Sequence, residues 1–318
     1  MPQPTQSQVH IDAALTDVSV AFSQEPGSFV ADKVFPRVNV AKQSDKYWVW
    51  DRNNFLIDSM EKRADGQESA GGGLELSTDS YFCDVYALHK DIGAQTRANE
   101  DPGVRLDEAV TKYLTGQAML KLERSFVTTF MGSGIWSTTV TGASNYTQWD
   151  DASSNPEKNI DDGKQYILQR TGYEPNTLVT DYATYQALKR HPLIKDRTKY
   201  TSADSITQKI IANFFEIDNL YVAKSMYASN NEGAATDTYA FNFPKGALLA
   251  WVPAQAGLLV PSPGYTFVWN GMAGAVDGQS IGRIDMPLAK SERLEIETNF
   301  DQKIVSSELG YYFASTVA

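Results

Sequence analysis

The chain has 318 residues, of which 42% are hydrophobic, so it can bury a sizeable core and is predicted to form about two domains. Its 28 basic and 39 acidic residues give a formal net charge of -11, which repels phosphate and disfavours a dedicated nucleic-acid reader. We expect a protein made in the cytoplasm without membrane contact, because the first twenty residues lack a signal pattern and the longest apolar stretch, 246–264, is interrupted by prolines. The single cysteine, Cys83, is predicted to be a small buried hydrophobe.

The first 28 residues are polar and rich in Gln, Ser and Thr. A short apolar set with helical spacing would share one helix face; its members are Ile11, Leu15, Val18 and Phe22. The segment is predicted to be either a frayed terminus or an arm that orders only against a neighbour. The pattern alone favours neither alternative.

The next segment alternates apolar and aromatic residues up to residue 52, which favours extended structure. Residues 51–78 differ in kind, because charged side chains and three successive glycines prevent them from burying much surface. Two strand-like runs, 46–50 and 81–88, flank this stretch. The sequence therefore predicts a long projecting hairpin, which is uncommon unless it has a function.

Residues 104–131 contain no proline, begin with acidic residues and are followed by Gly132 and Gly134. This pattern predicts one long helix. An apolar stripe at helical spacing runs along it and comprises Leu106, Val110, Tyr113, Leu114, Met119, Leu122, Phe126 and Phe130. We expect the later part of this stripe to pack on a sheet that contains Leu294, Ile296 and Phe300.

After a connection at 132–159, helical and strand patterns alternate and predict a second, α/β unit. Helices are expected at 159–171, 182–189 and 205–214, and strands at 177–179, 220–223, 239–243 and 247–252. The final stretch is predicted to form two antiparallel strands, 293–300 and 303–313, that turn near Asp301 and Gln302.

No arrangement of residues typical of catalysis or metal binding is found in the sequence. The three histidines, His10, His89 and His191, are far apart and lack cysteine or carboxylate partners at ligand spacing. The Gly-rich segment at 132–137 lacks the third glycine of a dinucleotide-binding motif, and helix termination explains it better. We therefore predict no catalytic, cofactor-binding or metal-binding residue, and no enzymatic activity.

Two segments carry a resemblance to a known family. They read FVADKVFP at 29–36, followed by KQSDKY at 42–47, and TGYEPNTLV at 171–179, followed by matching positions up to Tyr200. These segments resemble the major capsid proteins of tailed bacteriophages, and the resemblance extends over nearly the whole chain. It implies an α+β architecture, the Hong Kong 97-like capsid fold.

The resemblance also implies how the chain is divided. The parts expected are an N-terminal arm at 1–40, an extended loop at 41–88, a peripheral domain at 89–158 and 265–318 with a spine helix at 104–131, and an axial domain at 159–264. Such a polar arm and charged hairpin have little use in a monomer, whereas subunits that close into rings need surfaces that reach their neighbours.

The family's function implies self-assembly as hexamers and pentamers into an icosahedral virion head that encloses double-stranded DNA, formed in the host cytoplasm. A portal protein is the expected partner, with separate scaffolding or decoration proteins as further ones, because the capsid-like pattern begins too near Met1 for a built-in scaffold. Some family members join subunits through a lysine–asparagine bond. Lys62 and Asn299 are formal candidates for such a bond, but we assign them no catalytic role.

Three alternatives stay open at this stage. An encapsulin-like nanocompartment shell would share the fold but enclose a cargo enzyme. An α/β enzyme would need a site within 159–264, where convergent polar groups are missing from the sequence. A ligand-binding module would be a stable monomer with a pocket, so closed particles in electron micrographs would exclude both of the latter.

Overall fold

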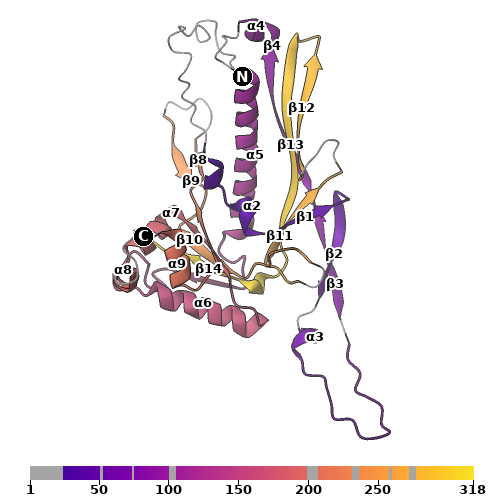
Figure 1. Cartoon of the computed structure of the whole chain (residues 1–318), viewed down its shortest axis with the longest axis vertical. Helices are drawn as coiled ribbons and strands as arrows, with labels where there is room; N and C mark the ends of the chain where they lie inside the picture. The colour runs from indigo at the N-terminus through magenta and orange to yellow at the C-terminus, as the bar shows by residue number, and fades with distance from the viewer. Residues whose placement is uncertain are drawn as a thin grey trace.

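The structure is a computed structural model of the chain, and it describes residues 24–50, 53–73, 75–99, 105–198, 207–230, 236–257, 260–271 and 277–318 (Figure 1). Within these ranges the chain forms two five-stranded sheets, one long helix, several shorter helices and two hairpins. None of the helices in these ranges combines the length and the apolar character that crossing a bilayer requires.

The first sheet is organised around one long strand, β13 (Ser291–Ile304). It pairs antiparallel with β12 (Gln279–Met286), β4 (Asp84–Gly93) and β11 (Gly264–Trp269). The remaining strand, β1 (Arg37–Val40), runs parallel to β11. A short helix, α4 (Ala94–Ala98), follows β4 at the far end of this sheet (Figure 1).

The predicted turn near Asp301 and Gln302 is wrong. β13 continues through both residues because they pair with Phe267 and Thr266 of β11. The residues after β13 form the 3-10 helix η3 (Ser307–Leu309) and then β14 (Gly310–Ala314), which belongs to the other sheet. The alternating apolar pattern of residues 293–300 thus covers only part of β13, which extends beyond it at both ends.

The second sheet has the order β5-β14-β10-β6-β7. Besides β14, its strands are β5 (Thr138–Thr141), β10 (Gly246–Ala250), β6 (Thr177–Asp181) and β7 (Asn219–Ala223). Every residue of β6 and β10 is buried, which is typical of a sheet covered on both faces. The helices around it are α6 (Pro156–Thr171), α7 (Tyr182–Arg190), α8 (Pro192–Thr198) and α9 (Gln208–Phe214).

The predicted α/β pattern of this second unit is confirmed, since its helices and strands lie within a few residues of their expected positions. Two strands of its sheet come from outside the range predicted for the unit. β5 lies in the stretch expected to be only a connection, and β14 lies in the stretch expected to join the first sheet.

The predicted long helix is confirmed as α5 (Leu106–Phe130). Its buried apolar residues recur at every fourth position and are Leu114, Ala118, Leu122, Phe126 and Phe130. Because four residues exceed one helical turn, this stripe rotates by about 40° per step around the helix and meets different partners along its length. Tyr113, which was expected in the stripe, is 52% exposed.

The rotation of the stripe corrects the predicted packing. The first half of α5, at Leu114 and Ala118, packs on Leu294 and Ile296 of β13. The second half, from Leu122 to Phe130, shares its core with Phe300 and with residues from three other segments: Phe35, Phe243 and Trp136. Only Phe300 of the three expected sheet residues therefore faces the later turns.

Residues 29–35 contribute buried side chains to the core of the subunit, although they fall within the range predicted for the arm. The 3-10 helix η2 (Pro26–Ser28) leads into α2 (Ala31–Val34), and Val30, Val34 and Phe35 are buried against α5. The predicted helical face at Ile11, Leu15, Val18 and Phe22 lies outside the described residues.

Two hairpins complete the fold. β2 (Ser44–Trp50) pairs with β3 (Leu76–Phe82), and the short helix α3 (Asn53–Leu56) follows β2. β8 (Met226–Ala228) pairs with β9 (Tyr239–Phe241). In Figure 1 the β2–β3 hairpin extends away from both sheets, whereas β8 and β9 lie beside α5.

Candidate assembly surfaces

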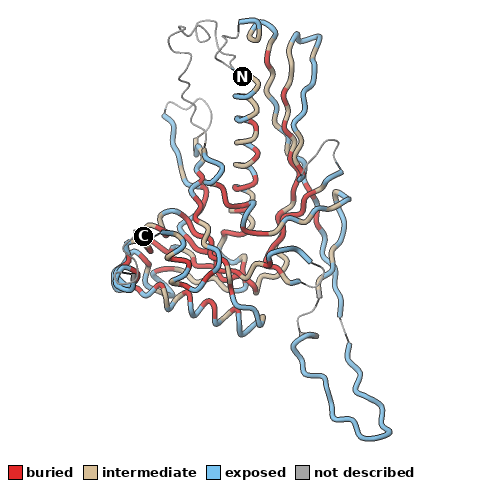
Figure 2. Tube along the Cα trace, viewed as in Figure 1, coloured by how far each residue is buried: buried red, intermediate tan, exposed pale blue. Residues whose placement is uncertain are grey.

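The β2–β3 hairpin is the largest feature that the subunit's own core does not stabilise. Every described residue from Phe55 to Glu75 is exposed, and Figure 2 shows this segment as a continuous exposed loop that projects from the body. The predicted projecting hairpin is thus confirmed. The second flanking strand, predicted at 81–88, is wrong: β3 (Leu76–Phe82) pairs with β2, and residues 84–88 belong to β4.

Large apolar side chains are concentrated on this hairpin and are open to solvent. They are Trp48, Phe55, Leu56, Ile57, Met60, Leu76 and Phe82. Met60 is 92% exposed, so almost none of its apolar surface is protected within the subunit. An exposed apolar group of this size is typical of a surface that a partner covers.

The base of the hairpin is fixed to the first sheet by aromatic stacking. The Tyr81 and Phe267 rings stack with centroids 4.7 Å apart, and the Tyr47 ring lies 5.3 Å from the same phenylalanine. The backbone N–H of Phe82 donates to Asp301 Oδ2 at 2.9 Å. The hairpin therefore has a rigid attachment and an unsupported far end.

Cys83 lies in this attachment and is fully buried, which confirms its predicted character. Burial, together with the nearby carboxylates of Asp301 and Asp84, raises the pKa of its thiol to about 11. The thiol is therefore protonated at neutral pH, and protonated thiols are poor nucleophiles.

A buried carboxylate on α5 joins two distant segments of the chain to this helix. Glu123 is 0% exposed, and its Oε2 accepts hydrogen bonds from the backbone N–H groups of Val30 (3.0 Å) and Ala31 (2.8 Å). Its Oε1 accepts a bond from Ser225 Oγ at 3.0 Å. Glu123 thereby caps the start of α2 and holds this segment against α5.

We expect Glu123→Ala to destabilise the subunit by about 1–3 kcal/mol for each buried N–H left without an acceptor. Glu123→Gln should be tolerated, because the amide oxygen can accept both backbone bonds.

Burial raises the pKa of the Glu123 carboxyl above its ordinary value, although its hydrogen bonds oppose the shift. The folded state therefore gains stability from protonated Glu123 at acid pH and loses it as pH rises through the raised pKa.

Denaturant unfolding of the wild type and both variants at two pH values tests this interpretation. The stability of Glu123→Gln relative to the wild type should increase from acid to neutral pH, because the amide does not ionise. A relative stability that does not change with pH would mean that folding does not raise the pKa of the Glu123 carboxyl. A fully stable Glu123→Ala would mean that the cap is dispensable.

The described residues with potentially catalytic or metal-binding side chains do not come together in one site. His191 is buried, and its ring Nε2 lies 3.0 Å from Ser154 Oγ, whereas His89 is exposed on β4. His10 lies outside the described residues. Within the described ranges, no group of three or more His, Cys, Asp or Glu residues could hold a metal ion.

The two formal cross-linking candidates differ sharply in accessibility. Lys62 is exposed on the hairpin, but Asn299 is only 1% exposed. The Asn299 Oδ1 accepts a hydrogen bond from the Trp269 backbone N–H at 2.8 Å. In this structure the burial of Asn299 keeps its amide out of reach of a lysine from another subunit.

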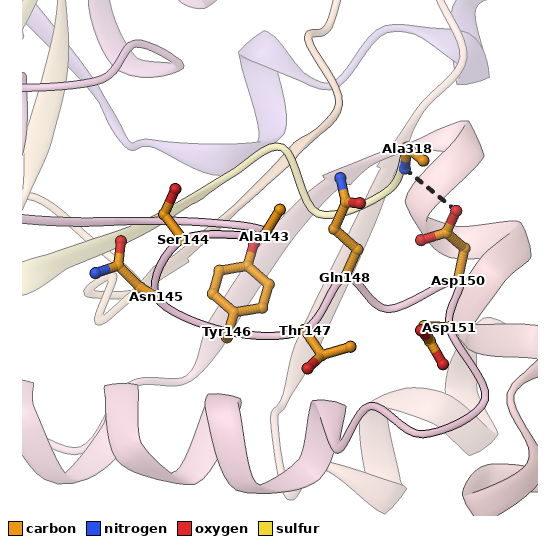
Figure 3. Close-up of a pocket in the computed structure, with 9 residues that line it drawn as sticks. All are labelled: Ala143, Ser144, Asn145, Tyr146, Thr147, Gln148, Asp150, Asp151 and Ala318. Carbon is orange, nitrogen blue, oxygen red and sulfur yellow. Dashed lines mark hydrogen bonds between the residues drawn. The ribbon is translucent and has the colours of Figure 1, made fainter.

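One hollow on the surface has a volume of about 710 Å³ and is open to solvent. Figure 3 shows its lining from the loop at 143–151 and from Ala318, whose backbone N–H donates to Asp150 Oδ2 at 3.2 Å. Its side chains are small or polar and spread around the rim. They contain no nucleophile paired with a base, so the hollow has none of the geometry of a catalytic site.

No protein-family model matches the chain. Two curated relatives cover most of it. The major capsid protein of Burkholderia phage BcepMu is 24% identical over 265 residues, which cover 80% of this chain and 82% of that protein. The major capsid protein of Pseudomonas phage JBD67 is 25% identical over 325 residues, with 97% of each chain covered.

Solved structures share the fold at lower identity. A phage-related protein from Bordetella bronchiseptica matches with a TM-score of 0.70 and 20% identity, covering 92% of this chain and 94% of that one. The mature capsid of bacteriophage PhiM1 matches with a TM-score of 0.59 and 10% identity over 98% of both chains. An encapsulin from Synechococcus elongatus also matches, with a TM-score of 0.55, 9% identity, and 96% and 95% coverage.

The fold alone does not distinguish a phage head from a cellular compartment, because both kinds of shell protein match it. The sequence relatives do distinguish them, since both are phage major capsid proteins and one aligns along almost the entire chain. Together with the projecting apolar hairpin and the mixed α+β architecture, these matches lead to one conclusion. The chain belongs to the tailed-phage major capsid proteins with the Hong Kong 97-like fold.

Proposed function

We propose that this subunit builds its icosahedral head from hexamers and pentamers in which the β2–β3 hairpin lies across a neighbouring subunit. The observation that carries the proposal is the hairpin itself, whose apolar side chains, among them Trp48, Ile57 and Met60, are exposed to solvent. In water such surface is unfavourable, so covering it drives association. The protein is a structural component of the virion capsid and not an enzyme.

The role that we propose for each part of the chain follows from the architecture. The residues before Phe29 would act as the arm, the hairpin as the extended loop, and α5 with the first sheet as the peripheral domain. The second sheet with α6 to α9 would be the axial domain, to which we add β5 and β14 because they complete that sheet. This extends the axial domain beyond the range 159–264.

Partners other than the subunit itself are also proposals. A head that is filled with double-stranded DNA needs one vertex with a portal protein, and assembly could use a separate scaffolding or decoration protein. The net charge of -11 is consistent with DNA that is enclosed without tight or sequence-specific binding, because most of the surface repels phosphate.

Purified protein should form rings or closed shells at high concentration. Sedimentation velocity and negative-stain electron microscopy would detect them as particles far larger than the 35.1 kDa subunit. A species that stays monomeric and compact at every concentration would contradict the proposal. A shell that encloses a cargo enzyme in its natural host would instead favour the cellular compartment.

A further inference from the structure

The strand β12 forms an open edge of the first sheet. Among the described residues its only strand partner is β13, so one of its two backbone edges has no ladder partner there. Figure 1 shows β12 at the right-hand margin of this sheet, with β13 between it and β4. An unpaired row of N–H and C=O groups is a template on which another strand can bind.

This edge lacks the features that normally prevent pairing. Native sheets protect their edges with lysine, proline or bulges. β12 contains neither lysine nor proline, and its pairing with β13 runs from Gln279 to Met286 without a bulge. It carries instead Ile281 and Ile284, which are 50% and 48% exposed. The edge is therefore open to a strand from another chain.

Gly282, in the middle of β12, indicates the close approach of another backbone. A Cβ atom added at this position would meet no atom within 4 Å, and the φ of Gly282 is not positive. The packing and conformation of the described subunit thus do not require glycine here. Glycine weakens the interior of a strand and is often found where a second backbone comes close.

The charges of β12 favour a cation beside this edge. Arg283 lies on the α5 side of the sheet, where it binds Asp107 at 2.6 Å and Glu292 at 3.2 Å. Side chains alternate along a strand, so Asp285 lies on the same side, directly opposite Glu292. In the described part of the chain no cation pairs with Asp285. Like charges opposite each other are unfavourable, and a cation from another strand would offset them.

A second copy of β12 supplies that cation when the two strands run antiparallel about a two-fold axis. If Ile284 lies opposite the partner's Ile284, then Arg283 of each strand lies opposite Asp285 of the other. Shifting the strands by two residues places either Arg283 or Asp285 opposite its own copy, which is unfavourable. A one-residue shift would mismatch the backbone groups that must face each other. The strand is thus self-complementary in one register, as a two-fold contact requires.

We propose that β12 pairs antiparallel with β12 of a second subunit, centred on Ile284, so that their first sheets become one continuous sheet. The inference rests on the proposed function, but the contact is separate from the β2–β3 hairpin. Adjacent members of a ring are related head to tail, whereas this contact is two-fold. It therefore joins subunits of different rings and connects hexamers and pentamers to one another.

The β2–β3 hairpin of a neighbour is the competing occupant of this edge. A hairpin on β12 would bring two different segments together, so the same residue of two copies would not meet. The two-fold pairing instead brings Ile284 of both copies to about 4.5–5.5 Å between Cα atoms, a separation that a disulfide can bridge. The two occupants thus predict different cross-links.

Cysteine cross-linking in assembled particles tests this register. Ile284→Cys places two thiols opposite each other, and Gly282→Cys/Met286→Cys does the same for a second pair, because residues 282 and 286 are opposite in the proposed register. Gly282→Cys alone is the matched control, since it would face Met286. The native Cys83 is buried and should not react. Particles are oxidised, and covalent dimers are measured by non-reducing electrophoresis.

We expect more than about half of the subunits to form dimers with Ile284→Cys and with the double variant, and at least about fivefold fewer with Gly282→Cys alone. Intact Ile284→Cys particles without dimers would overturn the inference and leave the proposed function standing. Equal dimer yields from Gly282→Cys would also overturn it, because the register would be different. Unmodified protein that forms no particles would refute the proposed function and this contact with it.

Asp285→Arg separates the formation of rings from the joining of rings. It places an arginine opposite the partner's Arg283 twice in each contact, whereas Asp285→Asn, the control, removes the charge without adding repulsion. We expect Asp285→Arg to keep its rings and its cooperative unfolding, and to yield at least about tenfold fewer closed shells than the control at low salt, where charges are least screened. Sedimentation velocity measures both species. Normal shells would overturn the inference, and so would a loss of rings, which would place β12 within a ring.

Discussion

Shortening the β2–β3 hairpin should abolish closed particles while leaving a folded subunit. The change replaces residues 51–75 with Asn-Gly, so that Trp50 and Leu76, which are cross-strand partners, flank a two-residue turn. The removed segment contributes no buried described residue to the core, and the aromatic attachment at Tyr81 and Phe267 is retained. Negative-stain microscopy and cooperative thermal unfolding measure the two consequences separately.

A second variant distinguishes the length of the hairpin from its chemistry. Phe55→Ser/Ile57→Ser/Met60→Ser keeps the chain length but removes most of the exposed apolar surface. We expect it to lose particles as well, because burial of apolar area drives the contact at about 25 cal/mol per Å². Normal shells from either variant would exclude the hairpin as an assembly element, and an unfolded shortened variant would place it in the core.

Phe126→Ala should destabilise the subunit by about 3–5 kcal/mol and yield largely insoluble protein. Phe126 is fully buried, and its ring lies 5.7 Å from Phe35, 5.0 Å from Phe130 and 5.9 Å from Phe243, measured between centroids. These partners come from the segment after α2, from α5 itself and from the segment after β9. The cavity left by Phe126→Ala would therefore lie where three parts of the chain meet.

Tyr113→Ala is the matched control, because it removes an aromatic ring from the exposed side of the same helix. We expect its effect on the free energy of unfolding to be within about 0.5 kcal/mol. Denaturant unfolding of soluble protein, or the soluble fraction on expression, compares the two variants. A Phe126→Ala subunit as stable as the control would mean that this turn of α5 does not carry the core.

The sequence by itself determined the elements whose pattern is local. The absence of proline, the acidic first turn and the glycines after residue 131 define α5, and the alternation of helix and strand patterns defines the second unit. The charged, glycine-rich stretch before Leu76 identified the hairpin, because such residues cannot be buried wherever the chain places them. The burial of Cys83 followed from its chemistry alone.

Only the tertiary structure decided which segments pair. β13 runs through Asp301 and Gln302 because β11 supplies partners for both, and β14 leaves the first sheet because β10 and β5 lie on its two sides. The burial of Glu123 also depends on distant segments, since its hydrogen-bond donors are 92 to 102 residues away along the chain. On a helix, a lone glutamate normally indicates a solvated face. Here the rotation of the apolar stripe turns it inward, where backbone N–H groups at the start of α2 stabilise the carboxylate.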